Sequence, residues 1–262
     1  MAVKRLEDLT PLEKLALVDI SYSRLSTYEM CKAKYFYNYV AKEETVFGEH
    51  AKLGNVLHST LENVLEPGTP VEISNLMSEY ETQSLQWDPD NKISMKLIED
   101  GRGMLEDFAD RHSGETFNIL EKEKEFAIVV GGGLIRGFID RVDVHEDTVY
   151  IVDYKSGRRE VTYANVASDL QLGIYALAMS KEYPDKNIHA SLYYLRSGRQ
   201  KGHLFSTSDL EVVEDRLVNL IYELISSEVF EVTSNTRVCT FCDFATTGAC
   251  RVGQRRKKDL GY

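Results

Sequence analysis

Two short segments of the sequence carry side chains that could hydrolyse a phosphodiester bond with the help of a metal ion. Asp153 and Lys155 lie two residues apart, directly after the apolar run of residues 149–152, and Asp140 lies in a segment just upstream. Alternate residues of a β-strand share one face, so Asp153 and Lys155 should point the same way. A carboxylate can bind a hard divalent cation, while a neighbouring ammonium group can reach the water or phosphate beside that cation.

This spacing has an ordinary alternative, because an Asp and a Lys two residues apart usually form the solvated face of a strand. The apolar, β-prone residues 149–152 instead favour a buried strand, at whose end charges need a functional explanation. Residues 134–144 are predicted as another strand, followed by the turn-like residues 145–147. A hairpin between the two strands would place Asp140 beside Asp153.

Four cysteines form a second pattern with chemical potential. Cys239 and Cys242 make a C-x-x-C pair, Cys250 follows shortly after, and Cys31 lies far upstream. In a reducing compartment such spacing favours thiolate ligands over disulfides, and four thiolates suit zinc or a cubane iron–sulfur cluster. The ligands alone do not separate these two occupants, and the alternative is a set of small buried hydrophobic residues.

Composition indicates a folded protein that does not coat nucleic acid. The 262 residues are 43% hydrophobic and 28% charged, with a formal net charge of -11. No apolar run approaches membrane-spanning length and the first residues lack the apolar stretch of a secretory signal, so we expect a cytoplasmic protein without a membrane partner. Basic residues near the C-terminus form either a local contact surface or a solvated tail: Arg251, Arg255, Arg256, Lys257 and Lys258.

Hydrophobic periodicity predicts alternating helices and strands, which indicates an α/β layer structure in one compact domain. Ser21 or Ser23 is the expected N-cap of the first helix, and His58 shares an apolar stripe with Leu61 and Leu65, as core histidines often do. The expected helices cover residues 21–40, 54–65, most of 71–112 with a break near 87–90, about 169–181 and about 209–227. The expected strands cover residues 117–130, 134–144, the segment from 149, 188–195 and 202–206.

Taken in order, the motifs resemble the RecB-type branch of the PD-(D/E)xK nucleases, above all its members with an iron–sulfur cluster. These members include CRISPR-associated adaptation exonucleases, AddB-type helicase-nuclease subunits and single-strand exonucleases of mitochondria and nuclei. The resemblance rests on Ser21 to Leu25 with Cys31, Gly54-x-x-x-His58, Gly137-x-x-Asp140-Arg141-x-Asp143, Asp153 to Gly157, Gln171-x-x-x-Tyr175 and Cys239-x-x-Cys242. Two departures are Lys32, where the family commonly has Pro, and a longer interval between Cys242 and Cys250.

The resemblance implies a restriction-endonuclease-like core, in which a central mixed sheet is flanked by helices. All 262 residues would form a single nuclease domain. Its expected parts are a helical arm at about 71–113, a nuclease core at about 115–206, and a four-cysteine iron–sulfur lobe formed by residues 21–40 and 229–262.

The resemblance also implies roles for individual residues. His58, Asp140 and Asp153 would bind Mg²⁺ or Mn²⁺ together with the backbone carbonyl of Tyr154, and Lys155 would orient the attacking water or stabilise charge. On the strand before the hairpin, the spacing to Phe126 favours Glu123 as a further catalytic residue, although Glu121 and Glu125 are expected on the same face. Gln171 and Tyr175 would contact DNA beside the metal, or form a simple helix-surface pair. The four cysteines would bind a 4Fe-4S cluster, with zinc as the alternative: Cys31, Cys239, Cys242 and Cys250.

The expected function is therefore a metal-dependent DNA exonuclease that acts on single-stranded or frayed ends in recombination, repair or phage DNA processing. One alternative is a CRISPR-adaptation nuclease that trims spacer precursors beside an integrase, and a helicase is another conceivable partner. A second alternative is a non-catalytic DNA-binding module that keeps the same fold.

Overall fold

A computed structural model describes residues 20–45, 48–90 and 92–261 of the chain. The described residues divide into two compact units, which we name by their contents. The sheet unit comprises the described residues of 47–126 and 138–213, and the cysteine unit comprises those of 1–46, 127–137 and 214–262. Every predicted catalytic residue lies in the sheet unit, and all four cysteines lie in the cysteine unit.

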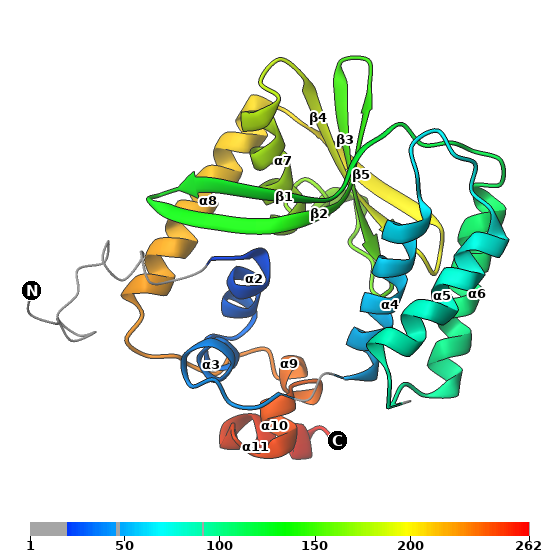
Figure 1. The fold of residues 1–262 in the computed structure, drawn as a ribbon. Helices are drawn as coiled ribbons and strands as arrows, with labels where there is room; N and C mark the ends of the chain where they lie inside the picture. Colours follow the sequence, from blue (N-terminus) through cyan, green and yellow to red (C-terminus); the bar gives the residue numbers. More distant parts are fainter. Residues whose placement is uncertain (1–19, 46–47, 91, 262) are drawn as a thin grey trace, which may run out of the picture. The chain divides into compact units, whose positions relative to one another are not determined.

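The helices and strands of the described residues closely follow the expected order (Figure 1). They are α2 (Tyr22–Met30), α3 (Lys32–Tyr35), η2 (Phe36–Val40), α4 (Glu49–Val64), α5 (Ile73–Trp87), α6 (Met95–Arg111), β1 (Ile119–Val130), β2 (Gly133–His145), β3 (Thr148–Lys155), η3 (Tyr163–Asn165), α7 (Leu170–Glu182), β4 (Asn187–Tyr194), β5 (Arg199–Phe205), α8 (Thr207–Ser226), α9 (Arg237–Thr240), α10 (Asp243–Thr247) and α11 (Arg251–Asp259). None of these helices has both the length and the apolar character needed to cross a membrane.

The strands form one mixed sheet in the order β1-β2-β3-β4-β5, which confirms the predicted α/β class. β2 and β3 are antiparallel, β3 and β4 are parallel, and β4 and β5 are again antiparallel. Parallel neighbours need a crossover, and α7 supplies it between β3 and β4. α7 packs against both strands, and its residues 170–179 are all buried. Its N-cap is Asp169, whose carboxylate accepts a hydrogen bond from the Leu172 amide at 3.1 Å.

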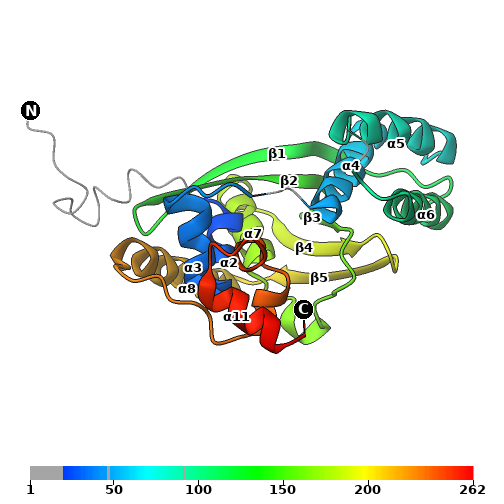
Figure 2. The same ribbon diagram turned by 90° about the horizontal axis from the view of Figure 1, so that it is seen from below.

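Three helices, α4, α5 and α6, pack side by side within the sheet unit (Figures 1 and 2). Their buried faces share one hydrophobic core with Val152, Tyr154 and Tyr193 of the sheet. The predicted break between the second and third helices is confirmed, and Asp88 organises it. Its buried carboxylate accepts a hydrogen bond from the Ile93 amide at 2.6 Å and pairs with Lys52 at 2.6 Å.

The first predicted helix is wrong in one respect, because it is not continuous from 21 to 40. Ser21 is its N-cap, as expected, but the chain becomes extended at Cys31, with φ -164° and ψ 112°. The Cys31 amide closes α2 on the Thr27 carbonyl, and the Ala33 amide then bonds to the Glu231 carbonyl of the same unit. No glycine or proline marks this break, so a long-range backbone contact decided it.

α6 contains a matched pair of glycines that tests the helix packing. A Cβ at Gly101 would overlap the Tyr80 hydroxyl and lie 2.7 Å from Leu53 Cδ1, whereas a Cβ at Gly103 would meet nothing within 4 Å. We expect Gly101→Ala to lower the free energy of unfolding by about 1–3 kcal/mol through overpacking. Gly103→Ala should raise it by about 0.5–1 kcal/mol, because alanine favours the helix. Urea denaturation of both variants measures this, and equal shifts in the two would contradict the packing.

Candidate active site

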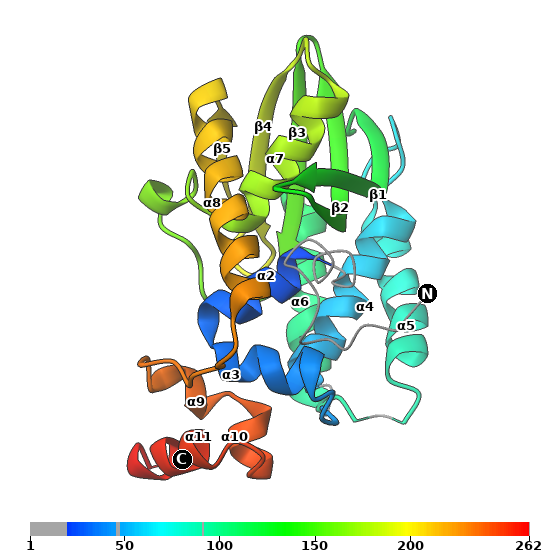
Figure 3. The same cartoon turned by 90° about the vertical axis from the view of Figure 1, so that its left-hand side faces the viewer.

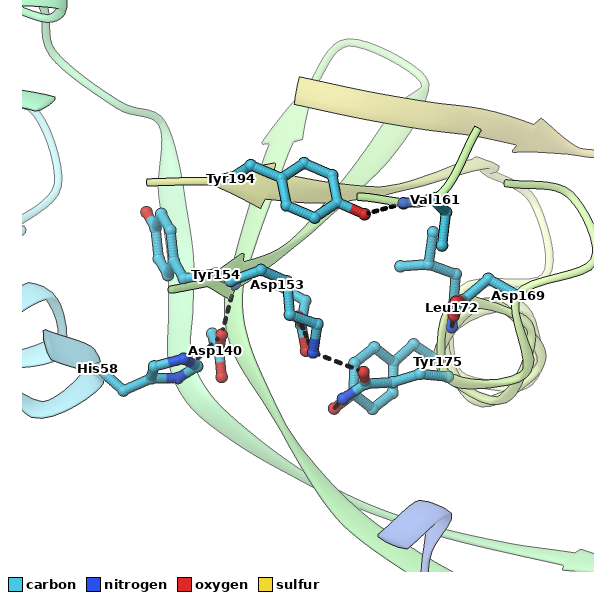
Figure 4. A network of polar contacts seen from close by, with 11 residues as sticks. His58, Asp140, Asp153, Tyr154, Val161, Asp169, Leu172, Tyr175 and Tyr194 are labelled. Carbon is cyan, nitrogen blue, oxygen red and sulfur yellow. Dashed lines mark hydrogen bonds and ion pairs between the residues drawn. The ribbon is translucent and has the colours of Figure 1, made fainter. Parts of the chain in front are cut away.

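The hairpin of β2 and β3 brings the two predicted catalytic aspartates together, as expected. Arg141 pairs with Val152, so one further step of this antiparallel register sets Asp140 opposite Asp153. The two strands are also joined through a side chain, because the Tyr154 amide donates a hydrogen bond to Asp140 Oδ2 at 2.7 Å (Figure 4). The Asp140 carboxylate is thereby fixed in place by the backbone of the neighbouring strand.

His58 reaches this hairpin from α4. Its Nδ1 lies 3.2 Å from Asp140 Oδ2, and 32% of its side chain is exposed, so it is not an ordinary core histidine (Figure 4). Gly54 lies one turn earlier on the same helix, and a Cβ there would contact Ser156 Oγ at 3.6 Å. Desolvation by burial lowers the pKa of His58, but the adjacent Asp140 carboxylate outweighs it and the pKa rises to about 8.

A chain of polar contacts connects the second aspartate to α7. Lys155 Nζ lies 2.6 Å from Asp153 Oδ2 and donates a hydrogen bond to Gln171 Oε1 at 2.7 Å. Gln171 Nε2 in turn donates to the Tyr175 hydroxyl at 2.8 Å, and the Tyr175 ring packs edge-on against Phe126 at 5.7 Å. Gln171 and Tyr175 are therefore part of the site network and not a simple pair on a helix surface.

Burial governs the electrostatics of the carboxylates. Only 2% of the Asp153 side chain is exposed, and this burial raises its pKa to about 6, although Lys155 opposes the rise. Burial also raises the pKa of Asp140, but His58, the Tyr154 amide and Lys155 together more than compensate, so that pKa is lowered overall. Two acidic groups held this close, one on each strand, need nearby positive charge to remain ionised.

The three glutamates of β1 do not share a face, which corrects the strand prediction. Glu123 adopts a positive φ of 44°, a conformation that puts a kink into the strand. Glu121 lies beside Lys124 at 2.8 Å, a contact between residues that a regular strand would keep on opposite faces. Burial raises the pKa of Glu123, and together with the negative charges of Asp140 and Glu62 it brings that pKa to about 7.

The negative charges of both Asp140 and Asp153 raise the pKa of Glu123, which indicates that its carboxyl lies near the two aspartates. This supports its selection as the further acidic residue, although its catalytic role stays a prediction. Backbone strain in a non-glycine residue frequently accompanies functional sites. Strict alternation along the sequence could not have revealed the kink.

Behind the catalytic face lies a buried polar network whose role the sequence did not indicate. Arg141 donates a hydrogen bond to the Tyr154 hydroxyl at 2.6 Å and pairs with Asp143 at 3.0 Å. Its guanidinium also stacks 4.2 Å above the Phe117 ring. Because Arg141 and Tyr154 flank Asp140 and Asp153 in sequence, this network immobilises the backbone of both strands at the site. The signal was present in the motif, since Arg141 and Asp143 follow Asp140 at fixed spacing.

The oxygen and nitrogen donors of the site are of the types that bind a hard divalent cation. Two carboxylates and an imidazole converge, and the buried Asp153 Oδ2 lies 2.6 Å from the Lys155 ammonium. In the present arrangement Asp140 is engaged by His58 and the Tyr154 amide, and Asp153 by Lys155. The predicted role of the Tyr154 carbonyl as a ligand stays a prediction.

The four cysteines come together in the cysteine unit, as free and buried thiols. Cys239, Cys242 and Cys250 pack with Phe244 and Ala245 in a small cluster. Burial raises the pKa of the Cys250 thiol, and the neighbouring sulfurs of the other three cysteines act in the same direction. A hydrogen bond from the Gly253 amide to Cys250 Sγ opposes this rise. Their chemistry fits a thiolate-bound metal or cluster.

Neither group of candidate ligands is arranged as a completed metal site. Within residues 20–45, 48–90 and 92–261, no three His, Cys, Asp or Glu side chains are placed so that they could hold a metal ion together. The iron–sulfur cluster and the catalytic cation therefore stay predictions that rest on the kind and proximity of the donors.

Comparisons with known proteins indicate the family of the chain. A family model described as the PD-(D/E)XK nuclease superfamily matches residues 19–250. Over 127 residues, the chain is 28% identical to the Gene 69 protein of Mycobacterium phage D29 and 29% identical to that of Mycobacterium phage L5. Each match covers 46% of this chain and, respectively, 45% and 41% of the phage protein, so the chain spans less than half of these relatives.

A solved structure shares the fold. The crystal structure of a "putative exonuclease" from Eubacterium rectale superposes with a TM-score of 0.52 at 10% sequence identity. The superposition covers 96% of this chain and 93% of that chain. At this identity the likeness concerns the fold alone.

The kink at Glu123 can be tested through stability. We expect Glu123→Gly to raise the free energy of unfolding by about 1 kcal/mol, because glycine adopts a positive φ without steric cost. Glu125→Gly is the matched control on the same strand, and it should lower the free energy of unfolding by about 0.5–1 kcal/mol. Urea denaturation compares the two, and a Glu123→Gly variant as destabilised as the control would show that the kink is unstrained.

Proposed function

The chain belongs to the PD-(D/E)XK nuclease superfamily, and from this we propose that it is a DNA exonuclease that uses Mg²⁺ or Mn²⁺ and acts on single-stranded or frayed ends. The observation that carries the proposal is the contact chain of Asp153, Lys155 and Gln171, with Asp140 and His58 on the neighbouring elements. It joins acidic groups that can bind a cation to a lysine that can reach the reacting phosphate.

Each residue has a definite task in the proposed reaction. Asp140, Asp153 and His58 would hold the cation, which supplies charge that acidifies the attacking water and neutralises the phosphate. Lys155 would orient the water or stabilise negative charge in the transition state. Gln171 holds the Lys155 ammonium through its carbonyl oxygen, and its own amide group is fixed by Tyr175. This fixation means that the lysine is positioned before substrate binds.

Exonuclease activity and a role in phage DNA processing are proposed from the similarity to known proteins. The E. rectale protein that shares the fold is described as a putative exonuclease, which supports exonuclease activity over internal cleavage. The similar Gene 69 proteins come from mycobacteriophages, which supports a role in phage DNA processing or recombination. The preference for single strands rests on the resemblance of the motifs to RecB-type nucleases.

The proposal is tested by digesting end-labelled single- and double-stranded DNA with Mg²⁺ or Mn²⁺. We expect Lys155→Ala and Asp153→Asn each to slow cleavage by about 10²-fold or more, because each removes a group acting in the transition state. Lys96→Ala, which removes an exposed lysine of α6, is the matched control and should cleave normally. The labelled products also show whether the ends are shortened stepwise.

Metal-dependent cleavage retained at the control rate in either active-site variant would refute the assignment of Lys155 or Asp153. An inactive wild-type protein that still binds DNA would favour a non-catalytic binding module. Circular dichroism of all variants establishes that they are folded.

We also propose that the four cysteines bind a 4Fe-4S cluster, which would connect α2 and α3 to the C-terminal helices of the cysteine unit. A protein purified without oxygen should be brown and contain iron and sulfide in equal amounts. Cys242→Ser should lose the colour and melt at a lower temperature, because cluster binding would contribute folding energy. A colourless wild-type protein with stoichiometric zinc would overturn the choice of iron.

A further inference from the structure

The last helix of the cysteine unit carries a stripe of positive charge that neither the catalytic site nor the fold explains. Arg251, Arg255 and Lys258 are exposed and lie at i, i+4 and i+7 on α11. This spacing places all three on one narrow face of the helix. Gly253 lies on the opposite face, where it is buried against Cys250 and Ala245. The stripe therefore points away from the cysteines.

The other basic residues of α11 make side-chain hydrogen bonds that the stripe lacks. Arg256 donates a hydrogen bond to the Thr233 carbonyl, and Lys257 donates one to Thr246 Oγ1 at 2.8 Å. Among the described residues, no ion pair or hydrogen bond engages the side chains of the stripe: Arg251, Arg255 and Lys258.

The position of Arg251 does not serve the stability of the helix. It lies in the first turn of α11, where the helix dipole disfavours a cation. The chain has a formal net charge of -11, so three unpaired cations on one face are also not part of a generally basic surface. Together these features indicate an anionic partner for the stripe.

An exposed aromatic residue belongs to the same group of helices. Phe241 follows α9 directly, and 82% of it is exposed. α11 packs against both α9 and α10, and Figures 1 and 3 show the three helices side by side. An exposed phenylalanine contributes nothing to the hydrophobic core, but its ring is an available surface for stacking a nucleobase.

We propose that the stripe of α11 and Phe241 form a binding surface for single-stranded DNA. The three cations contact successive phosphates, and Phe241 stacks on an unpaired base. A duplex keeps its bases stacked inside, so the aromatic ring selects the single strand. This surface consists only of residues of the cysteine unit and rests on the proposed function in that DNA is taken as the substrate.

The electrostatic part is tested by fluorescence anisotropy with a labelled oligothymidine, without added divalent cation, over a range of salt concentrations. In the triple variant Arg251→Ala/Arg255→Ala/Lys258→Ala, the slope of log affinity against log salt should become shallower by about 2. Each lost contact with a phosphate of single-stranded DNA contributes about 0.7 to this change. The matched control is Lys42→Ala/Lys96→Ala/Arg136→Ala, which removes three exposed cations elsewhere. Equal slopes in the two triple variants would overturn the proposal.

The stacking part is tested with Phe241→Ala and an abasic oligonucleotide of the same length. Wild type should bind the abasic strand about tenfold more weakly than oligothymidine, as expected for the loss of a stacked base. Phe241→Ala should bind both strands alike, and Phe241→Trp should restore the preference. A Phe241→Ala variant with an undiminished preference for bases would overturn this part.

These outcomes are distinguishable from a failure of the proposed function. Lys155→Ala should lose cleavage while it keeps the preference for oligothymidine over the abasic strand, whereas the α11 triple variant should lose affinity and still cleave at saturating DNA. If polyglutamate of equal charge displaces oligothymidine and Phe241→Ala has no effect, the stripe is a docking site for an acidic protein and the proposal fails.

Discussion

The burial of the Asp153 carboxylate is the constraint on which the site depends. An ionised carboxylate without exposure to water is costly unless positive charge or hydrogen bonds compensate it. Lys155 supplies that charge on the same face of β3, and Gln171 of α7 holds the lysine in place. The crossover helix α7 therefore stabilises β3, the strand that it follows, and also sets the geometry at the charged end of β3.

Asp140 depends on the same principle but uses different partners. The Tyr154 amide and His58 engage the same carboxylate oxygen, so β2, β3 and α4 meet at one atom. On the other face, Arg141 bridges Asp143 and the Tyr154 hydroxyl, which prevents the two strands from sliding past each other. A reactive face and a supporting face thus alternate along the same few residues, because a strand directs successive side chains to opposite sides.

The cysteine unit follows a different physical logic. Its four thiols are buried, three of them in one small cluster, and burial and the neighbouring sulfurs raise the pKa of the Cys250 thiol. Such a cluster gains most from a ligand that neutralises several thiolates at once. Arg251, Arg255 and Lys258 of α11 lie on the face opposite Gly253, so one short helix presents a packed face inward and a cationic face outward.

The sequence alone determined the features that depend on short-range patterns. Alternation placed Asp153 and Lys155 on one face, and the turn after His145 placed Asp140 beside Asp153. Ser21, one of the two expected N-caps, begins the first helix. These features depend on local backbone geometry, and that geometry is controlled by the types of residues only a few positions apart. The mixed α/β sheet followed from the order of such elements.

Only the tertiary structure decided the features that depend on contacts between distant segments. They include the break of the first helix at Cys31, the kink at Glu123, the pairing of His58 with Asp140, and the network around Arg141. Local preference does not encode any of these, because each arises where packing or a long-range hydrogen bond outweighs the regular period of a helix or strand.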